Sequence, residues 1–93
     1  MAAVASIEQK SQQGTDPLPQ RVLGKTGESV PKLGLGTGPT GYGMKDENAI
    51  SLIHRAIDLG VTAVDTAPGY DRAQVQLGEV MKERRREVFL ITK

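Results

Sequence analysis

The sequence predicts an α/β fold with parallel strands, and two observations indicate it. First, a short hairpin pattern over residues 21–31 is followed by strand, helix, strand, helix and strand patterns in that order. Alternation of this kind joins parallel strands through helical crossovers. Second, polar side chains follow neighbouring strands, with Asp65 after the second and Lys93 after the third. Two architectures fit this order, an eight-stranded (β/α)8 barrel and a doubly wound open sheet.

The N-terminal segment differs in composition from the rest of the chain. Residues 1–20 are rich in Gln, Ser, Ala and Pro and have no apolar periodicity. Pro17 and Pro19 favour an extended backbone, so we expect a disordered N-terminal tail over residues 1–20. Residues 21–31 contain short apolar runs around Gly24 and Gly27, a pattern typical of a hairpin.

The first strand and helix follow directly. Residues 32–37 predict a weak strand, because glycine lowers strand propensity. A glycine-rich loop is expected over residues 38–45. Asp46 is a suitable N-cap for a helix that ends at Gly60. The apolar face of this helix consists of Ile50, Ile53 and Ile57.

The second half of the chain repeats the pattern. Residues 61–64 predict a strand that leads into Asp65, residues 72–84 a helix, and residues 88–91 a third strand that precedes Lys93. Side chains alternate between the two faces of a strand. If Asp65 and Lys93 point into a barrel mouth, their face also carries Ala63, Phe89 and Ile91. The opposite face, packed against the helices, then carries Val64, Val88 and Leu90.

Composition excludes several kinds of function. The 12 basic and 11 acidic residues nearly balance, so nothing indicates nucleic acid or a membrane as a partner. The absence of cysteine excludes disulfides, thiolate zinc sites and a cysteine nucleophile, and one histidine cannot by itself supply a metal cluster. No apolar run approaches the roughly 18 residues of a membrane helix. We therefore expect a cytoplasmic protein without a metal site.

A dinucleotide-binding pattern, G-x-G-x-x-G, occurs at residues 36–41, and Asp65 ends the following strand. This arrangement would favour the open sheet. In that motif, however, the helix begins inside the glycine pattern, whereas here residues 42–45 separate the last glycine from Asp46. Pro39 also removes a backbone N–H from the stretch that should donate to phosphate. A flexible glycine-rich loop is the better interpretation.

Asp65, Tyr70 and Lys93 have a shared chemical logic. Taken singly, they are a turn-capping carboxylate, a half-buried ring and a surface lysine. In a barrel, however, the carboxyl ends of neighbouring strands face one mouth, where polar residues are typically catalytic. A tyrosine phenol has a pKa of about 10, which a nearby ammonium lowers, while a carboxylate holds that ammonium in place. Such a phenol can protonate a carbonyl oxygen as hydride arrives from a nicotinamide.

Several segments together resemble the aldo-keto reductase superfamily, in its order. They are RVLGKTG at 21–27, LGLGT at 33–37, AIDLG at 56–60, DTAPGY at 65–70, LGE at 77–79 and VFLITK at 88–93. The resemblance covers residues 21–93, and its most specific part is Asp65-x4-Tyr70 followed by Lys93. It implies the N-terminal portion of a (β/α)8 TIM barrel whose bottom is closed by the hairpin, so residues 21–93 would form an incomplete barrel domain.

The resemblance also implies a role for each site residue. Tyr70 would be the proton donor, Lys93 would lower its pKa, and Asp65 would pair with Lys93 near the nicotinamide ribose. The residues implied to line the cofactor are Gly36, Thr37, Gly38 and Asp65.

The implied activity of the parent protein is reduction of aldehydes or ketones to alcohols with NADPH, or with NADH. Family members complete a tetrad with a histidine after strand four, and His54 cannot take that role because it falls in a helix. These 93 residues alone are therefore expected to be inactive. Two alternatives stay open: a non-catalytic nucleotide-binding subunit resembling potassium-channel β-subunits, and a truncated inactive product.

Overall fold

The computed structural model describes residues 17–93, and the predicted hairpin opens this part of the chain. Strands β2 (Gln20–Val22) and β3 (Ser29–Pro31) pair antiparallel. Gly24 and Gly27 take φ angles of +54° and +79° in the connecting turn, a conformation that favours glycine. The first 16 residues of the expected disordered tail lie outside the described range, whereas Gln20 already belongs to a strand.

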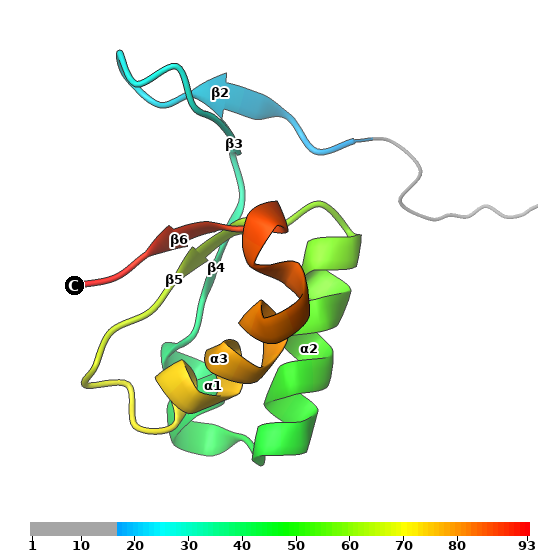
Figure 1. The fold of residues 1–93 in the computed structure, drawn as a ribbon, viewed down its shortest axis with the longest axis vertical. Coiled ribbons are helices and arrows are strands. Elements are labelled where there is room, and N and C mark those ends of the chain that lie inside the picture. The colour runs from blue at the N-terminus through cyan, green and yellow to red at the C-terminus, as the bar shows by residue number, and fades with distance from the viewer. Residues whose placement is uncertain (1–16) are drawn as a thin grey trace, which may run out of the picture.

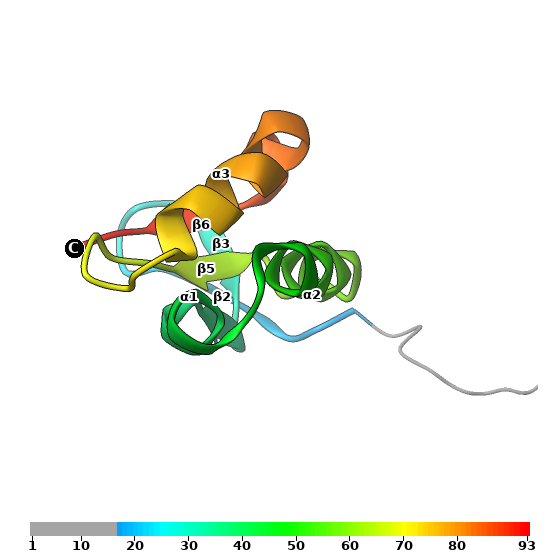
Figure 2. The same cartoon turned by 90° about the horizontal axis from the view of Figure 1, so that it is seen from below.

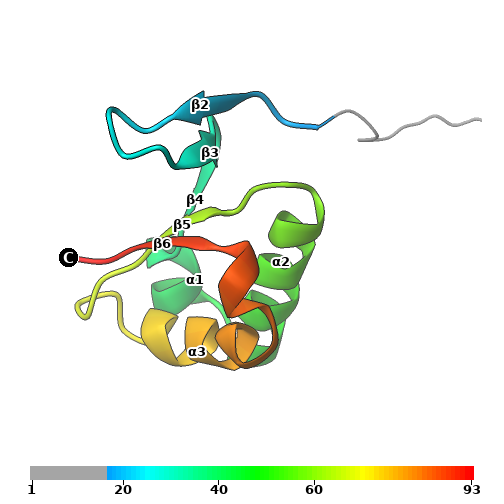
Figure 3. The same cartoon turned by 45° about the horizontal axis from the view of Figure 1, so that its top comes forward.

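Three parallel strands form the central sheet. Strands β4 (Gly34–Gly36), β5 (Ala63–Asp65) and β6 (Phe89–Ile91) are adjacent in chain order. The register places Gly36 opposite Asp65 and Asp65 opposite Ile91. In Figure 3 the three strands lie between the hairpin and the helices. Three strands in sequence order occur both in a barrel and in the first half of a doubly wound sheet.

Two longer helices cover one face of this sheet. Helices α2 (Asp46–Asp58) and α3 (Ala73–Arg84) pack side by side (Figures 1 and 2). The buried core joins them to the sheet and consists of Ile53, Ile57, Val64, Leu77, Val80 and Val88. Leu90 packs against this core while Ala63 and Phe89 face away from it, so the predicted alternation of faces is confirmed. Gly60 follows α2 with a φ of +93°, as the predicted helix end requires.

Helix α1 (Gly38–Gly43) occupies the region that was expected to be a loop, and that expectation is wrong. Pro39 lies in the first turn, where its restricted φ suits a helix and its missing N–H costs nothing. The Thr40 hydroxyl also donates to the carbonyl of Thr37 over 2.9 Å. Contrary to expectation, a helix therefore begins inside the glycine pattern of residues 36–41. The sequential strand order and the shared helical face are common to both architectures and do not choose between them.

Two smaller differences concern the ends of the long helices. Lys45, not Asp46, is the N-cap of α2, and Asp46 is its first residue. The Asp46 carboxylate bonds to residues of α3 instead of capping its own helix. A single 3-10 turn, η1 (Arg85–Glu87), follows α3. Arg84 stabilises this turn by donating to both carboxylate oxygens of Glu87.

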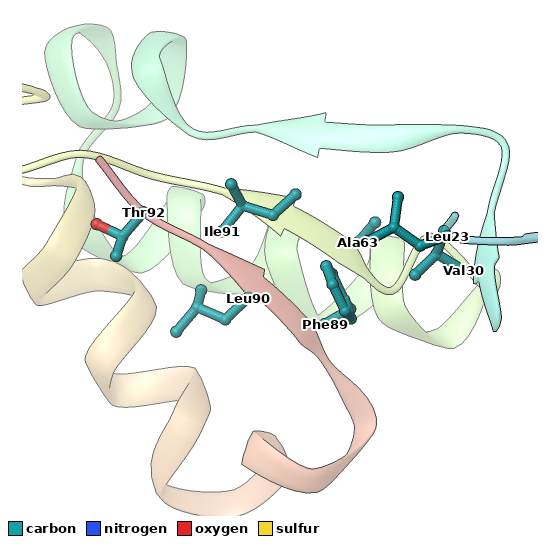
Figure 4. A pocket seen from close by; sticks show the side chains of 7 residues that line it. All are labelled: Leu23, Val30, Ala63, Phe89, Leu90, Ile91 and Thr92. Carbon is teal, nitrogen blue, oxygen red and sulfur yellow. The ribbon is translucent and has the colours of Figure 1, made fainter. Parts of the chain in front are cut away.

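The opposite face of the sheet borders an open apolar groove. Ala63, Phe89 and Ile91 line it from the sheet, and Leu23 and Val30 line it from the hairpin (Figure 4). Its volume is about 610 Å³. The sheet thus has one face covered by helices and one apolar face open between sheet and hairpin.

Candidate active site

The candidate site lies where β4, β5 and β6 end. Parallel strands bring their carboxyl ends to one edge of a sheet, and polar residues occupy that edge here. Asp65 is the last residue of β5, Thr37 follows β4, and Lys93 stands two residues beyond β6. Residues from three separate parts of the chain therefore meet at one edge.

Asp65 and Lys93 form an ion pair across the sheet. Lys93 Nζ lies 2.5 Å from Asp65 Oδ1, and the two side chains are 54% and 41% exposed. The pKa of Lys93 is raised above its usual range, chiefly because its ammonium donates a hydrogen bond to Asp65; partial burial opposes the shift and Tyr70 adds to it. Both side chains point to the same side of the sheet, as predicted.

Tyr70 lies beside this pair, in the turn between β5 and α3. Its backbone N–H donates to Ala67 over 3.1 Å, and its carbonyl accepts from Ala73 over 2.9 Å. Lys93 Nζ is 5.2 Å from the centroid of the Tyr70 ring. The three residues predicted to be catalytic thus form one cluster in the structure, and their individual roles stay predictions.

Thr37 holds the backbone of Asp65 in place. Its N–H and its hydroxyl both donate to the Asp65 carbonyl, over 3.0 and 2.9 Å. The Thr37 side chain is fully buried, so its hydroxyl proton is already used inside the protein. On the other side, the N–H of Thr66 donates to Ile91 over 2.8 Å and fastens the end of β5 to β6.

The two predicted cofactor-lining glycines have different surroundings. A Cβ on Gly36 would meet nothing within 4 Å, so the backbone borders open space opposite Asp65. A Cβ on Gly38 would lie 3.9 Å from the Tyr70 ring, so Gly38 packs against that ring. A partly exposed carboxylate beside a bare glycine backbone fits a nicotinamide ribose, whose hydroxyls need acceptors and close backbone approach.

Two further residues touch the turn that carries Tyr70, and neither was predicted from the sequence. The Tyr42 hydroxyl donates to the carbonyl of Gly69. A Cβ on Gly41 would come within 2.0 Å of the Tyr70 carbonyl oxygen. Gly41 was visible as the last glycine of the G-x-G-x-x-G pattern, and Tyr42 as one of only 2 tyrosines. Neither signal says what the residue contacts.

A polar network fixes the start of α3 to the start of α2, next to the Tyr70 turn. Arg72 Nη2 lies 2.6 Å from Asp46 Oδ2. The fully buried Gln76 donates to Asp46 Oδ1 over 3.1 Å and to the Met44 carbonyl over 3.3 Å. The pKa of Asp46 is held below its ordinary value, first by the hydrogen bond from Arg72 and then by that from Gln76.

Other features lie apart from this edge. His54 is on α2, where its carbonyl accepts from Arg84 Nη1 over 3.1 Å. The apolar groove between sheet and hairpin contains none of the clustered polar residues, so it is a poor candidate for the chemistry. Among residues 17–93 no group of three His, Cys, Asp or Glu could hold a metal ion. In the same range, no helix has the length and apolarity needed to cross a membrane.

Comparisons with known proteins agree with this geometry. The family model described as "Aldo/keto reductase family" matches residues 32–93. Pyridoxal 4-dehydrogenase of Microbacterium luteolum is 37% identical over 79 residues, and the match covers 80% of this chain and 23% of that protein. Aldo-keto reductase YhdN of Bacillus subtilis (strain 168) is 39% identical over 79 residues, covering 76% of this chain and 24% of that protein.

Solved structures with a similar fold carry the same family description. A solved structure from Pseudomonas aeruginosa, described as an aldo-keto reductase, superposes with a TM-score of 0.75 at 36% identity. The match covers 85% of this chain and 33% of that one. The chain therefore spans about a quarter of the curated relatives and has the α/β fold of part of a (β/α)8 barrel.

Proposed function

The chain belongs to the aldo/keto reductase family, and we propose that it supplies the Asp–Tyr–Lys part of the active site of an NADPH-dependent reductase. The substrate would be a small aldehyde or ketone and the product the alcohol. The observation that carries this proposal is the cluster at the sheet edge. Lys93 is paired with Asp65 at 2.5 Å and lies 5.2 Å from the centre of the Tyr70 ring.

In this proposal Tyr70 is the general acid. Its phenol donates a hydrogen bond to the substrate carbonyl oxygen and transfers the proton as negative charge develops there. The Lys93 ammonium stabilises the phenolate that is left, and Asp65 keeps the ammonium beside the ring. A reduced nicotinamide supplies the hydride when it is bound.

Asp65 has a second task in the same proposal. Lys93 donates a hydrogen bond to Oδ1 of the Asp65 carboxylate. The Asp65 side chain is nevertheless 41% exposed, and the neighbouring Gly36 has no side chain to fill the space beside it. Such a carboxylate can accept a hydrogen bond from a ribose hydroxyl. Thr37 would contribute by fixing the Asp65 backbone through its two hydrogen bonds.

The relatives support carbonyl chemistry over the alternatives. They are oxidoreductases, which does not favour a non-catalytic regulatory subunit. The name of one of them, pyridoxal 4-dehydrogenase, describes action on pyridoxal, which is an aldehyde. The substrate class proposed here is accordingly an aldehyde or ketone.

The test requires a complete barrel. Residues 20–93 would replace the equivalent segment of Bacillus subtilis YhdN, whose remaining strands supply the rest of the fold. In this grafted barrel, Tyr70→Phe should lower the kcat of carbonyl reduction by at least about 100-fold, because only the proton donor is removed. Initial rates with NADPH and with NADH against a panel of aldehydes and ketones measure the effect.

Cofactor affinity provides the control. The Kd for NADPH, measured by fluorescence titration, should be the same in the grafted barrel and in its Tyr70→Phe variant, since the phenol is not needed to hold the nucleotide. Unchanged turnover in Tyr70→Phe would refute the assignment of the proton donor.

A further inference from the structure

Helix α1 touches the turn that carries Tyr70 at three points. The N–H of Arg72 donates to the Gly41 carbonyl over 3.3 Å, the Tyr42 hydroxyl donates to the Gly69 carbonyl, and the Tyr70 ring packs on Gly38. The second half of the turn, from Gly69 to Arg72, thus contacts α1. We propose that Gly41 and Tyr42 are positioning residues that set the distance between the Tyr70 phenol and the Lys93 ammonium. This inference rests on the proposed function.

Gly41 lets the Tyr70 turn approach α1 closely because it has no side chain. A Cβ there would lie 2.0 Å from the Tyr70 carbonyl oxygen and 2.8 Å from the backbone nitrogen of Ala73. These are backbone atoms, so no side-chain rotation relieves the clash. Because real Cβ contacts essentially never fall below 3.0 Å, any larger residue must widen the spacing between α1 and the turn by about 1 Å.

Tyr42 contributes through its hydroxyl. The side chain is 65% exposed, so burial explains little of its position. Its hydroxyl bonds the carbonyl immediately before Tyr70, and the two rings lie 6.3 Å apart with a tilt of 56°. The bond therefore ties the turn to α1 at the residue that precedes Tyr70.

The geometry makes the phenol sensitive to these contacts. Lys93 is anchored to Asp65 on the sheet, whereas Tyr70 lies in a turn that contacts α1 and bonds to Ala73 at the start of α3. When the turn shifts, the phenol moves and the ammonium stays. A misplacement of about 1 Å in a reacting group can lower the rate by roughly 100-fold.

Gly41→Ala tests the proposal directly, and Gly43→Ala is its matched control. Both positions lie in α1, but a Cβ on Gly43 would meet nothing within 4 Å. In the grafted barrel, Gly41→Ala should lower kcat on the order of 100-fold. The Kd for NADPH should not change. Gly43→Ala should retain the kcat of the parent.

The pH profile separates positioning from general damage. A phenol displaced from its ammonium deprotonates less readily, so the fall of kcat at alkaline pH should move to higher pH in Gly41→Ala. Simple loss of folded protein would scale the whole profile without moving it. Thermal melts of both alanine variants report folding independently.

Tyr42→Phe provides a milder variant that keeps the ring. Loss of one hydrogen bond to the turn should lower kcat by up to roughly tenfold, with the alkaline limb moved in the same direction. Equal kcat values and pH profiles in Gly41→Ala and Gly43→Ala would overturn the proposal. So would a fall of kcat in Gly41→Ala that accompanies a lower melting temperature and leaves the pH profile in place. Failure of the proposed function gives a different result, unchanged turnover in Tyr70→Phe.

Discussion

The pKa of Lys93 depends on a partner far away in the sequence. In isolation it is a lysine beyond a strand, but its bond to Asp65 raises its pKa. A raised pKa means that the ion pair is fully present below the ordinary value of 10.5 and is lost as the pH rises through the higher, folded value. Lys93 is therefore a charged ammonium throughout the neutral range.

Replacing this ammonium should change both rate and pH dependence. In the grafted barrel, Lys93→Met should lower kcat by at least about tenfold and move the alkaline fall of kcat to higher pH, because the phenolate loses its neighbouring charge. Lys25→Met, in the exposed hairpin turn, serves as the control. Steady-state rates across pH measure the effect. A Lys93→Met variant that retained the parent's pH profile would contradict this role.

The helices are joined at the site by polar contacts as well as by their apolar core. Asp46 at the start of α2 accepts hydrogen bonds from Arg72 and Gln76, at the start and in the first half of α3. The two donors, Arg72 and Gln76, follow the Tyr70 turn directly in sequence. The two helices and the turn are thereby held as one unit beside the strand ends.

The lowered pKa of Asp46 makes this link dependent on pH. Stability from a depressed carboxyl pKa is present above the ordinary value of 3.8 and is lost as the pH falls through the lower, folded value. Asp46→Asn should therefore lower the Tm of the grafted barrel at pH 7. The difference from the parent should shrink in acid below that ordinary value. Thermal melts monitored by circular dichroism measure both.

Glu47→Gln is the matched control for Asp46→Asn. Glu47 is an exposed carboxylate in the same first turn of α2, so it experiences the same helix dipole. Its replacement should have the smaller effect on Tm at pH 7. Equal effects of the two substitutions would mean that the dipole, and not the bonds to α3, accounts for the stabilisation.

The molecule as a whole has one covered and one open sheet face. The helices bury Val64 and Val88, whereas Phe89 and Ile91 line a groove of about 610 Å³ and Ile91 is 42% exposed. Parallel sheets are normally covered on both faces. Strands β4 and β6 also present edges, which favour association with other chains.

Expressed alone, the 93-residue polypeptide should not unfold cooperatively and should not bind NADPH measurably. Residues 21–93 form a domain of a size at which even a complete core gives only about 3–5 kcal/mol of stability, and here one apolar face is open. Circular dichroism melts and calorimetry against NADPH measure the two properties. A cooperative melt from a monomer, or micromolar affinity for NADPH, would contradict this expectation.

Local pattern was enough to predict most of the fold. The apolar spacing of Ile53 and Ile57 identified a buried helix face, because helical periodicity is a property of neighbouring residues. The same holds for the strands: a period of two places Asp65 and Lys93 on one side once the strands are recognised. The hairpin followed from glycines at positions that require positive φ.

Packing between distant segments decided the remainder. Glycine-rich α1 has little intrinsic helix propensity, so no local rule predicted it, and Asp46 bonds to α3 instead of capping its own helix. The contact of Gly41 with the Tyr70 turn joins residues 29 positions apart, and only the docking of α1 beside α3 creates it. Side-chain spacing along one element is local information, whereas the distance between two elements depends on every residue packed between them.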